Sequence, residues 1–479
     1  MQISSKRPLF RRRDDTVVYR MFLLVVLILG GIWLIRSVQQ GDVKPLFLPT
    51  PTPTRFASSY LLEGDALFTA GKLSDSVAED GTIIPGAITA YREAALVDPN
   101  NAEVLAQLAR IQIYSTALIV RQEEVLVRLD EALASAEKAI EINPDSSYAH
   151  AMYSLALNWK ASYTRADREK QSLRTQSEQA AVRALQLDNS SALAQAVYAE
   201  VLVDQQKWTQ ALQTIEQALE RDPSLMDVHR VHAYVLESLG EYALAIQSYD
   251  RAIAINPNLT FLYLRAGANY RALAFRSPNE QVQRDLYEKA LEYFADAARI
   301  NQQLGVQDPT PYLSIARTYS QMGEFFIAIR NVQRTIEFQP DNAVFYGELG
   351  TLYHKNRNYE TGILAFKCAV RGCTPEESCD GRGGCGPNDT PAAVEPVQLS
   401  LSTVYYFDIY ASQLAALSTP RQSYCAEALE IARIIESSEY ISDPNIAADM
   451  VVVRNICAFD TDANTSAGIR PTATPTTAP

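Results

Sequence analysis

The stretch AIAINPN, from Ala252 to Asn258, returns along the chain in closely related forms. Residues 139–145 read AIEINPD, residues 218–224 read ALERDPS, and residues 335–341 read TIEFQPD. Each copy places helix-favouring residues before a polar residue and a proline. Because proline pushes the residue before it out of the α region, each copy predicts the end of a helix.

These helix ends have a regular phase. One residue closes each unit: Pro99, Pro144, Asn189, Pro223, Pro257, Gln302, Pro340 and Thr374. Successive closing residues lie 34, 38 or 45 residues apart. Small residues stand five positions before the closers, at Ala94, Ala139, Ala184, Ala218, Ala252, Ala297, Thr335 and Ala369. Others stand twelve positions before, at Ala87, Ala132, Ser177, Ala211, Ala245, Ala290, Ala328 and Gly362. A larger residue stands eight positions before, at Tyr91, Ile215, Tyr249, Phe294, Val332 and Phe366. This spacing places the three positions on one helical face.

A further small residue occurs in the preceding helical stretch of each unit: Gly64, Ala109, Ser154, Ala199, Ala233, Gly267, Ala316 and Gly350. The pattern resembles the tetratricopeptide repeat family, whose unit is a helix–turn–helix of 34 residues. Residues 226–259, MDVHRVHAYVLESLGEYALAIQSYDRAIAINPNL, fit it well. The resemblance implies an all-α, right-handed α-solenoid of tetratricopeptide helix hairpins, with about eight units over residues 57–375.

Four of the units are longer by eleven residues. Eleven residues make about three helical turns, so a helix can lengthen by this amount and keep its packing face. In the first unit the extra stretch, residues 74–84, is polar, and we expect a loop there. The long units have either a structural role or a role in docking a partner.

An apolar stretch near the N-terminus predicts a membrane anchor. Residues 21–36 contain MFLLVVLILGGIWLI and follow a basic segment, residues 1–20. The basic side of a span stays in the cytoplasm, which predicts an N-terminal transmembrane helix with the repeats outside the cytoplasmic membrane, in a bacterial single-pass protein. A cleaved signal peptide is the alternative, but the following IRSVQQGD offers no small-x-small cleavage site. Residues 37–56, rich in Thr and Pro, predict a linker.

Three segments are expected after the repeats. Residues 376–397 predict a loop rich in Cys and Gly, and residues 398–460 predict helical hairpins that cap the solenoid. Residues 461–479, again rich in Thr and Pro, predict a disordered tail.

All six cysteines lie in the last quarter of the chain. An even number on the outer side of a membrane predicts disulfides. Cys425 and Cys457 lie sixteen residues before and after Ile441, near the centre of a predicted turn between two antiparallel helices. They are therefore predicted to pair, with two buried free thiols as the alternative. The pairing of the other four stays open: Cys368, Cys373, Cys379 and Cys385.

The sequence offers no motif for catalysis, a cofactor or a metal, so we expect no enzyme. His229 and His232 lie three residues apart, but no carboxylate or cysteine stands at the spacing of a zinc site. Residues 1–36 hold seven of the 43 basic and two of the 56 acidic residues, which leaves the rest of the chain with a net charge of −18. Such an acidic chain repels phosphate backbones, so no nucleic-acid partner is expected.

The tetratricopeptide resemblance implies a scaffold that binds a protein or peptide in the groove lined by the first helices. It places these residues in that groove: Asp65, Arg110, Glu200, Asp204, Arg230, Tyr234, Glu237, Arg271, Arg317, His354 and Lys355. The acidic members lie mainly in the N-terminal half and the basic ones in the C-terminal half. Two alternatives remain: a structural subunit of a cell-surface assembly or filament that associates with itself, and an accessory subunit of a membrane enzyme complex.

Overall fold

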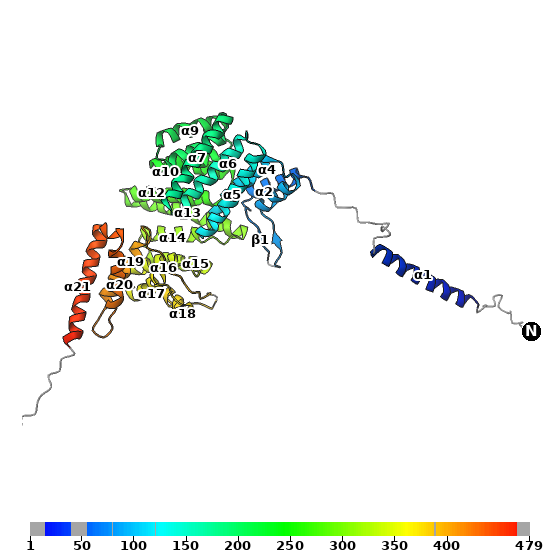
Figure 1. Ribbon diagram of the computed structural model, residues 1–479. Helices are drawn as coiled ribbons and strands as arrows, with labels where there is room; N and C mark the ends of the chain where they lie inside the picture. The colour runs from blue at the N-terminus through cyan, green and yellow to red at the C-terminus, as the bar shows by residue number, and fades with distance from the viewer. Residues whose placement is uncertain (1–14, 40–54, 79, 120, 388, 467–479) are drawn as a thin grey trace, which may run out of the picture. The chain divides into compact units, whose positions relative to one another are not determined.

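The structure, a computed structural model, describes residues 15–39, 55–78, 80–119, 121–387 and 389–466 (Figure 1). It divides into two compact units, Met1–Phe56 and Ala57–Pro479, which we describe separately. The first unit contains the helix α1 and the second contains all the repeats.

The helix α1 (Asp15–Gln39) begins inside the predicted basic segment and continues through the predicted span. Among the residues that the structure describes, no helix is both long enough and apolar enough to cross a membrane. The transmembrane helix predicted at residues 21–36 is therefore not confirmed. Residues 40–54 of the predicted linker and residues 467–479 of the predicted tail lie outside the described residues.

The helices α2 to α17 pair in chain order as eight helical hairpins, which confirms the all-α solenoid. The pairs are α2 (Ala57–Thr69) with α3 (Ala87–Val97), α4 (Ala102–Ser115) with α5 (Gln122–Ile142), α6 (Ser147–Tyr163) with α7 (Asp167–Leu187), α8 (Ala192–Asp204) with α9 (Trp208–Arg221), α10 (Met226–Leu239) with α11 (Tyr242–Ile255), α12 (Thr260–Arg276) with α13 (Glu280–Leu304), α14 (Thr310–Gln321) with α15 (Phe325–Phe338), and α16 (Ala343–Lys355) with α17 (Tyr359–Val370).

The Asn/Asp-Pro signature ends second helices, as predicted. After α11 the backbone N–H of Asn256 donates to the carbonyl of Ala252 at 3.0 Å, and Pro257 has no N–H to extend the helix. The polar residue also forms the next turn through its side chain. In the unit that ends with α9, Oδ1 of Asp222 accepts the backbone N–H of Ser224 at 3.0 Å. The polar residue and the proline thus act together as a stop and a turn.

Glycine-to-aromatic contacts join the two helices of three hairpins: Gly64 with Tyr91, Gly267 with Phe294, and Gly350 with Phe366. A Cβ atom added at Gly267 would lie 2.6 Å from Cε1 of Phe294, well inside van der Waals contact. The ring of Phe294 is fully buried at this position. The small residue of the first helix therefore makes room for the large residue of the second, as the spacing predicts.

In the hairpin of α6 and α7, both facing positions are serine. Oγ of Ser154 donates to the carbonyl of Ser177 at 2.8 Å, and Oγ of Ser177 donates to the carbonyl of Ser154 at 2.8 Å. Both side chains are buried, and these bonds satisfy their hydroxyl groups. Hydrogen bonds between these two small positions join the helices of this unit, whose larger position holds Ala181 instead of a ring.

The extra residues of three long units lengthen the second helices α5, α7 and α13. The loop predicted at residues 74–84 is wrong in part, because this stretch forms a hairpin of two short antiparallel strands, β1 (Ser76–Val77) and β2 (Ile83–Ile84). The turn between the strands contains Gly81, whose φ of 82° glycine adopts without steric cost.

The solenoid winds tightly enough for early units to contact late ones. Nδ2 of Asn258, just before α12, donates to the carbonyl of Thr69 at the end of α2, at 3.3 Å. Arg121 before α5 forms an ion pair with Asp341 before α16, at 2.7 Å. The first hairpin also shares a buried apolar cluster with the start of α12. The first unit therefore has neighbours that are distant in sequence.

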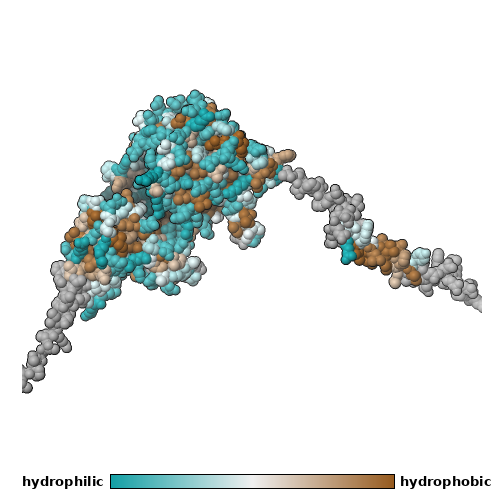
Figure 2. Space-filling model, viewed as in Figure 1, coloured by the Kyte–Doolittle hydropathy of each residue, from teal (hydrophilic) through white to brown (hydrophobic). Residues whose placement is uncertain are grey.

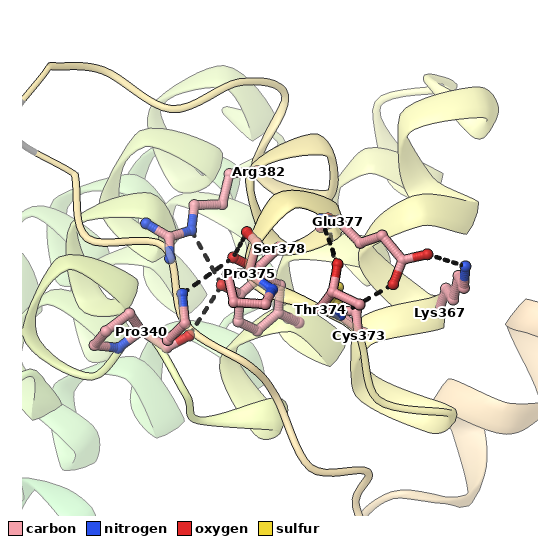
Figure 3. The surroundings of a disulfide bond; sticks show 11 residues. Pro340, Lys367, Cys373, Thr374, Pro375, Glu377, Ser378 and Arg382 are labelled. Atoms are coloured by element: carbon pink, nitrogen blue, oxygen red, sulfur yellow. Dashed lines mark hydrogen bonds and ion pairs between the residues drawn. A yellow bond between two sulfur atoms is a disulfide. The ribbon is translucent and has the colours of Figure 1, made fainter.

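The loop predicted at residues 376–397 is also wrong in part, because it contains most of the helix α18 (Pro375–Arg382). Oγ1 of Thr374 accepts the backbone N–H of Glu377 at 3.3 Å, and the carboxylate of Glu377 accepts the N–H of Thr374 at 3.0 Å (Figure 3). This capping box, followed by proline at the first helical position, starts a helix without a long apolar pattern.

The four cysteines around α18 form two short-range disulfides, Cys368–Cys373 and Cys379–Cys385. The side chain of Arg382 fixes the end of α18, since its Nε donates to the hydroxyl of Tyr346 at 3.0 Å. Covalent and polar bonds therefore order a segment that has little apolar surface to bury.

The C-terminal cap consists of α19 (Val404–Leu417), α20 (Cys425–Glu436), the short 3-10 helix η2 (Glu439–Ser442) and α21 (Pro444–Ser466) (Figure 1). The helix α19 packs against α16 and α17, and α20 and α21 pack against α19. A disulfide joins Cys425 to Cys457 with 5.2 Å between their Cα atoms, which is the pairing that the helix spacing predicts. In the chain-entropy model a loop of this length contributes about 3–4 kcal/mol to stability.

The contact between Gly267 and Phe294 gives the first testable prediction. Gly267→Ala should destabilise the repeats by about 1–3 kcal/mol, because the added methyl group overlaps the ring. In an open helix the same change stabilises by roughly 1 kcal/mol, so the sign of the effect is diagnostic. Urea unfolding of the full chain, followed by circular dichroism, measures it.

Two further variants serve as controls. Phe294→Leu in the Gly267→Ala background should recover part of the loss, and Gly31→Ala, where no atom lies within 4 Å of the added Cβ, should leave the transition of the repeats unchanged. A stabilising effect of Gly267→Ala would show that the close approach does not limit packing.

Candidate functional site

The first helices of the middle units line a pocket of about 410 Å³, which we call the aromatic pocket. Its walls include Trp159 and Tyr163 from α6, Tyr234 from α10 and Phe261 from α12. Its charged members are Glu200, Asp204, Arg230 and Arg265. The pocket is therefore a recess with an apolar wall and a small number of polar groups, which is the usual composition of a binding site.

A buried ion pair fixes one side of the aromatic pocket. Nη2 of Arg230 lies 2.6 Å from Oε2 of Glu200, with side chains only 8% and 6% exposed. Nε1 of Trp159 also donates to Glu200, at 2.9 Å. Burial alone would lower the pKa of Arg230, but the carboxylate of Glu200 raises it well above its usual value. The two side chains therefore neutralise each other as an ion pair.

A second buried pair lies behind the first. Arg110 of α4 forms an ion pair with Asp227 of α10, and the hydroxyl of Tyr114 donates to the same carboxylate. The ring of Tyr114 stacks on Phe261 with 5.8 Å between centroids. Burial would raise the pKa of Asp227, but Arg110 and Tyr114 hold it below its usual value. Early and middle units are thereby locked together, and this part of the groove is filled.

Asp204 differs from the other acids of the pocket. Its carboxylate accepts bonds from two neutral donors, Nδ2 of Asn158 at 2.6 Å and the hydroxyl of Tyr234 at 2.8 Å. Burial, and then the negative charge of Glu200, raise the pKa of Asp204. No basic side chain of the described residues forms an ion pair with it, although Arg174 acts on it from farther away.

A smaller pocket of about 190 Å³, which we call the basic pocket, follows along the same face. Its lining includes Arg271 from α12, Arg317 from α14, and Glu348 and Lys355 from α16. Arg317 forms an ion pair with Glu348, whereas Nζ of Lys355 donates to the hydroxyl of a serine. Burial, and then the charge of Arg317, lower the pKa of Arg271. Positive charge exceeds negative charge in this pocket.

The two pockets contain seven of the eleven groove residues expected from the sequence: Glu200, Asp204, Arg230 and Tyr234 in the aromatic pocket, and Arg271, Arg317 and Lys355 in the basic pocket. The other four bond within the chain. Arg110 is in the buried pair, and Asp65 accepts the hydroxyl of Tyr91. Glu237 pairs with Arg265 at 2.7 Å. The ring of His354 bonds to the cap residue Gln413 at 2.6 Å.

The pocket wall residues Trp159, Tyr163 and Phe261 were not expected from the sequence. Trp159 lies on α6 five residues after the small residue Ser154, the same offset that Asp204 has from Ala199, so the phase of the repeat could have marked it. Phe261, at the start of the first helix α12, has no counterpart among the expected groove residues. Their large rings on first helices were the available signal. What brings them together is the tight winding of the solenoid.

The two histidines of the pair bond to different parts of the chain. Nε2 of His229 lies 2.8 Å from the carbonyl of the closing residue Pro223, and Nδ1 of His232 lies 2.9 Å from Oγ of Ser248. In other units the side chain six residues after the closing residue also bonds to the carbonyl of that closing residue. These side chains are His150, Gln195, Tyr263 and Tyr346. These side chains therefore support the turn between units.

Comparisons with known proteins agree with this fold. Residues 197–260 match the tetratricopeptide repeat family, and a search of curated proteins found no match. Human IFIT1, solved as a dimer with m7Gppp-AAAA, is similar in structure with a TM-score of 0.52 and 13% identity, over 78% of this chain and 77% of that one. A monomeric IFIT1 mutant with m7Gppp-AAAA has a TM-score of 0.51 and 15% identity, over 88% and 93%.

A thermophilic tetratricopeptide repeat protein of Thermus thermophilus is 18% identical over 44% of this chain and 98% of its own, with a TM-score of 0.35. The match over residues 197–260 confirms the recognition of the tetratricopeptide repeat in this chain. This fold implies a scaffold for interactions between proteins.

The buried pair of Arg230 and Glu200 gives the second prediction. Arg230→Met should destabilise the repeats by about 3–5 kcal/mol, because it leaves the carboxylate of Glu200 buried without its cation. Urea unfolding of the full chain measures the loss. Arg284→Met, at an exposed position of α13, is the matched control and should change stability by less than about 0.5 kcal/mol. Equal effects of the two changes would contradict a structural role for Arg230.

Proposed function

We propose that the chain is a scaffold that holds an extended segment of a protein partner in the groove of its tetratricopeptide repeats. The observation that carries this proposal is the pair of pockets on one face, lined by first helices of successive units and unequal in charge. The visible surface of the repeats is mostly hydrophilic (Figure 2), so polar recognition suits it better than a broad apolar interface.

Nucleic acid is the less favoured partner. The IFIT1 structures contain short capped RNAs, but their identity to this chain is low enough to support the fold alone. The net charge of −18 after residue 36 opposes binding to phosphate backbones. The surplus positive charge of the basic pocket comes from two side chains, which is a small patch for a polyanion.

We also propose that α1 attaches the scaffold to a bacterial cytoplasmic membrane, with the repeats outside. Apolar side chains from Val18 to Trp33 are exposed along α1, which stands out in Figure 2 as a contiguous hydrophobic surface. Such a surface requires a cover, and a lipid bilayer with Arg20 and Arg36 at its two faces would supply one. Three disulfides favour an oxidising compartment.

Site-specific photocrosslinking in intact cells tests the groove. A benzophenone amino acid in place of Leu264, which lines the aromatic pocket, should form a covalent bond to a protein partner. The same residue in place of Phe326, exposed on the second helix α15, should give no such product and is the matched control. Adducts at Phe326 alone would contradict groove binding, and adducts between two copies of the chain would favour the self-assembling subunit.

A reporter fusion tests the location. A reporter that is active only in the cytoplasm, fused after Pro479, should be silent, because the basic residues before the apolar stretch keep the N-terminus inside. A fusion of the same reporter before Met1 should be active and is the control. Strong activity of the C-terminal fusion would overturn the proposed orientation.

A further inference from the structure

One carboxylate of the aromatic pocket, that of Asp204, has no basic side chain of the described residues as an ion-pair partner. Arg230 is neutralised by Glu200 at 2.6 Å, and Arg265 by Glu237 at 2.7 Å. Asp204 accepts hydrogen bonds from neutral groups alone, as described above. Each oxygen of a carboxylate can accept a further bond, so Asp204 has the capacity to receive a donor from outside the chain.

The walls around Asp204 suit a flat cation. The rings of Trp159, Tyr163, Tyr234 and Phe261 line the same pocket, and the faces of aromatic rings attract cations. The chain itself already uses this contact, since the guanidinium of Arg265 lies 5.5 Å from the ring centre of Tyr234. A guanidinium combines a planar, weakly hydrated body with donors that fit a carboxylate.

The basic pocket shows the opposite imbalance. Glu348 neutralises Arg317, which leaves Arg271 and Lys355 without a carboxylate partner among the described residues. Nη1 of Arg271 donates a hydrogen bond to the carbonyl of Ser314, at 3.5 Å. A carboxylate from outside the chain would supply the missing negative charge.

The helix α12 sets the spacing of the two pockets. Arg265 lines the aromatic pocket, and Arg271, six residues later on the same helix, lines the basic pocket. Six residues advance about 9 Å along a helix and leave the two side chains about 120° apart around its axis, so this rise is only the axial part of the separation. An extended peptide advances about 3.3 Å per residue, so side chains that reach both pockets are at least about three residues apart.

We infer that the groove binds an extended peptide of the partner, in which an arginine enters the aromatic pocket against Asp204 and a carboxylate at least about three residues away enters the basic pocket between Arg271 and Lys355. This inference rests on the proposed function and names the chemistry of the partner. Opposite charges at fixed spacing give specificity through complementarity, because an uncharged or inverted segment leaves each pocket unbalanced.

Fluorescence polarisation with the full chain in detergent tests the inference. The probes are capped, labelled octapeptides of Gly, Ser and Ala that carry Arg-x-x-Glu or Glu-x-x-Arg. One order should bind at least about tenfold more tightly than a peptide with citrulline and Gln in these places, since charge-assisted hydrogen bonds are lost. Citrulline keeps the shape of arginine without its charge, so this comparison does not depend on the folding of any variant.

Variants of the chain assign the charges to the pockets. D204N should lower the affinity for the tighter-binding peptide about tenfold. It should change the affinity for the citrulline form of that peptide less than about twofold, because the contact between the arginine and Asp204 is already absent there. R271Q should behave likewise toward the peptide glutamate. E216Q, at an exposed acid of the second helix α9, is the matched control and should leave all affinities unchanged.

The outcomes separate the inference from the function. Equal binding of arginine and citrulline peptides, or equal effects of D204N on both, would overturn the inference, and the groove would stand if Leu264 still crosslinks to a partner. Absence of that crosslink would overturn the proposed function itself. Tighter binding of a labelled oligoadenylate RNA than of any peptide would overturn both.

Discussion

The close contact between a small residue of one helix and a ring of the next is the constraint on which the rest of the solenoid depends. At Gly267 the absence of a side chain lets the ring of Phe294 lie where a Cβ atom would be only 2.6 Å away. Helices that pack this closely form stiff hairpins, and stiff hairpins pass a fixed rotation from each unit to the next. Where the small positions of both helices are serine, at Ser154 and Ser177, hydrogen bonds join the helices instead.

The rotations between successive units add up along the solenoid, and the first units therefore contact the middle ones. The contact of Asn258 with Thr69 and the ion pair of Arg110 with Asp227 both join residues far apart in sequence. These contacts close part of the groove, so that charges expected to face a partner are neutralised inside the chain. What stays open is a pair of pockets whose charges do not balance, and the imbalance gives the groove its chemistry.

Much of the candidate site could be predicted from the sequence, because first-helix positions are fixed by the phase of the repeat. Asp204 and Arg271 were expected in the groove for this reason, and both line pockets. The burial of Arg230 could not be predicted, because it depends on the approach of Glu200 and Tyr114 from two other units. Phe261 was missed because it stands at no position that the repeat pattern marks, whereas Trp159 shares the repeat position of Asp204 and could have been expected.

The sequence by itself determined the hairpins, their ends and the pairing of Cys425 with Cys457, because each depends on residues within one or two neighbouring helices. These features depend on local signals: a proline that ends a helix, small residues at helical spacing, and the number of residues between each cysteine and the turn. The helix α18 was not predicted, although the signal that starts it is local as well. Tertiary structure alone decided the neutralisation of the groove charges. The helix rests on a capping box in a segment without an apolar pattern. The neutralised charges rest on the winding angle of the solenoid, which is a sum of small rotations that no single residue specifies.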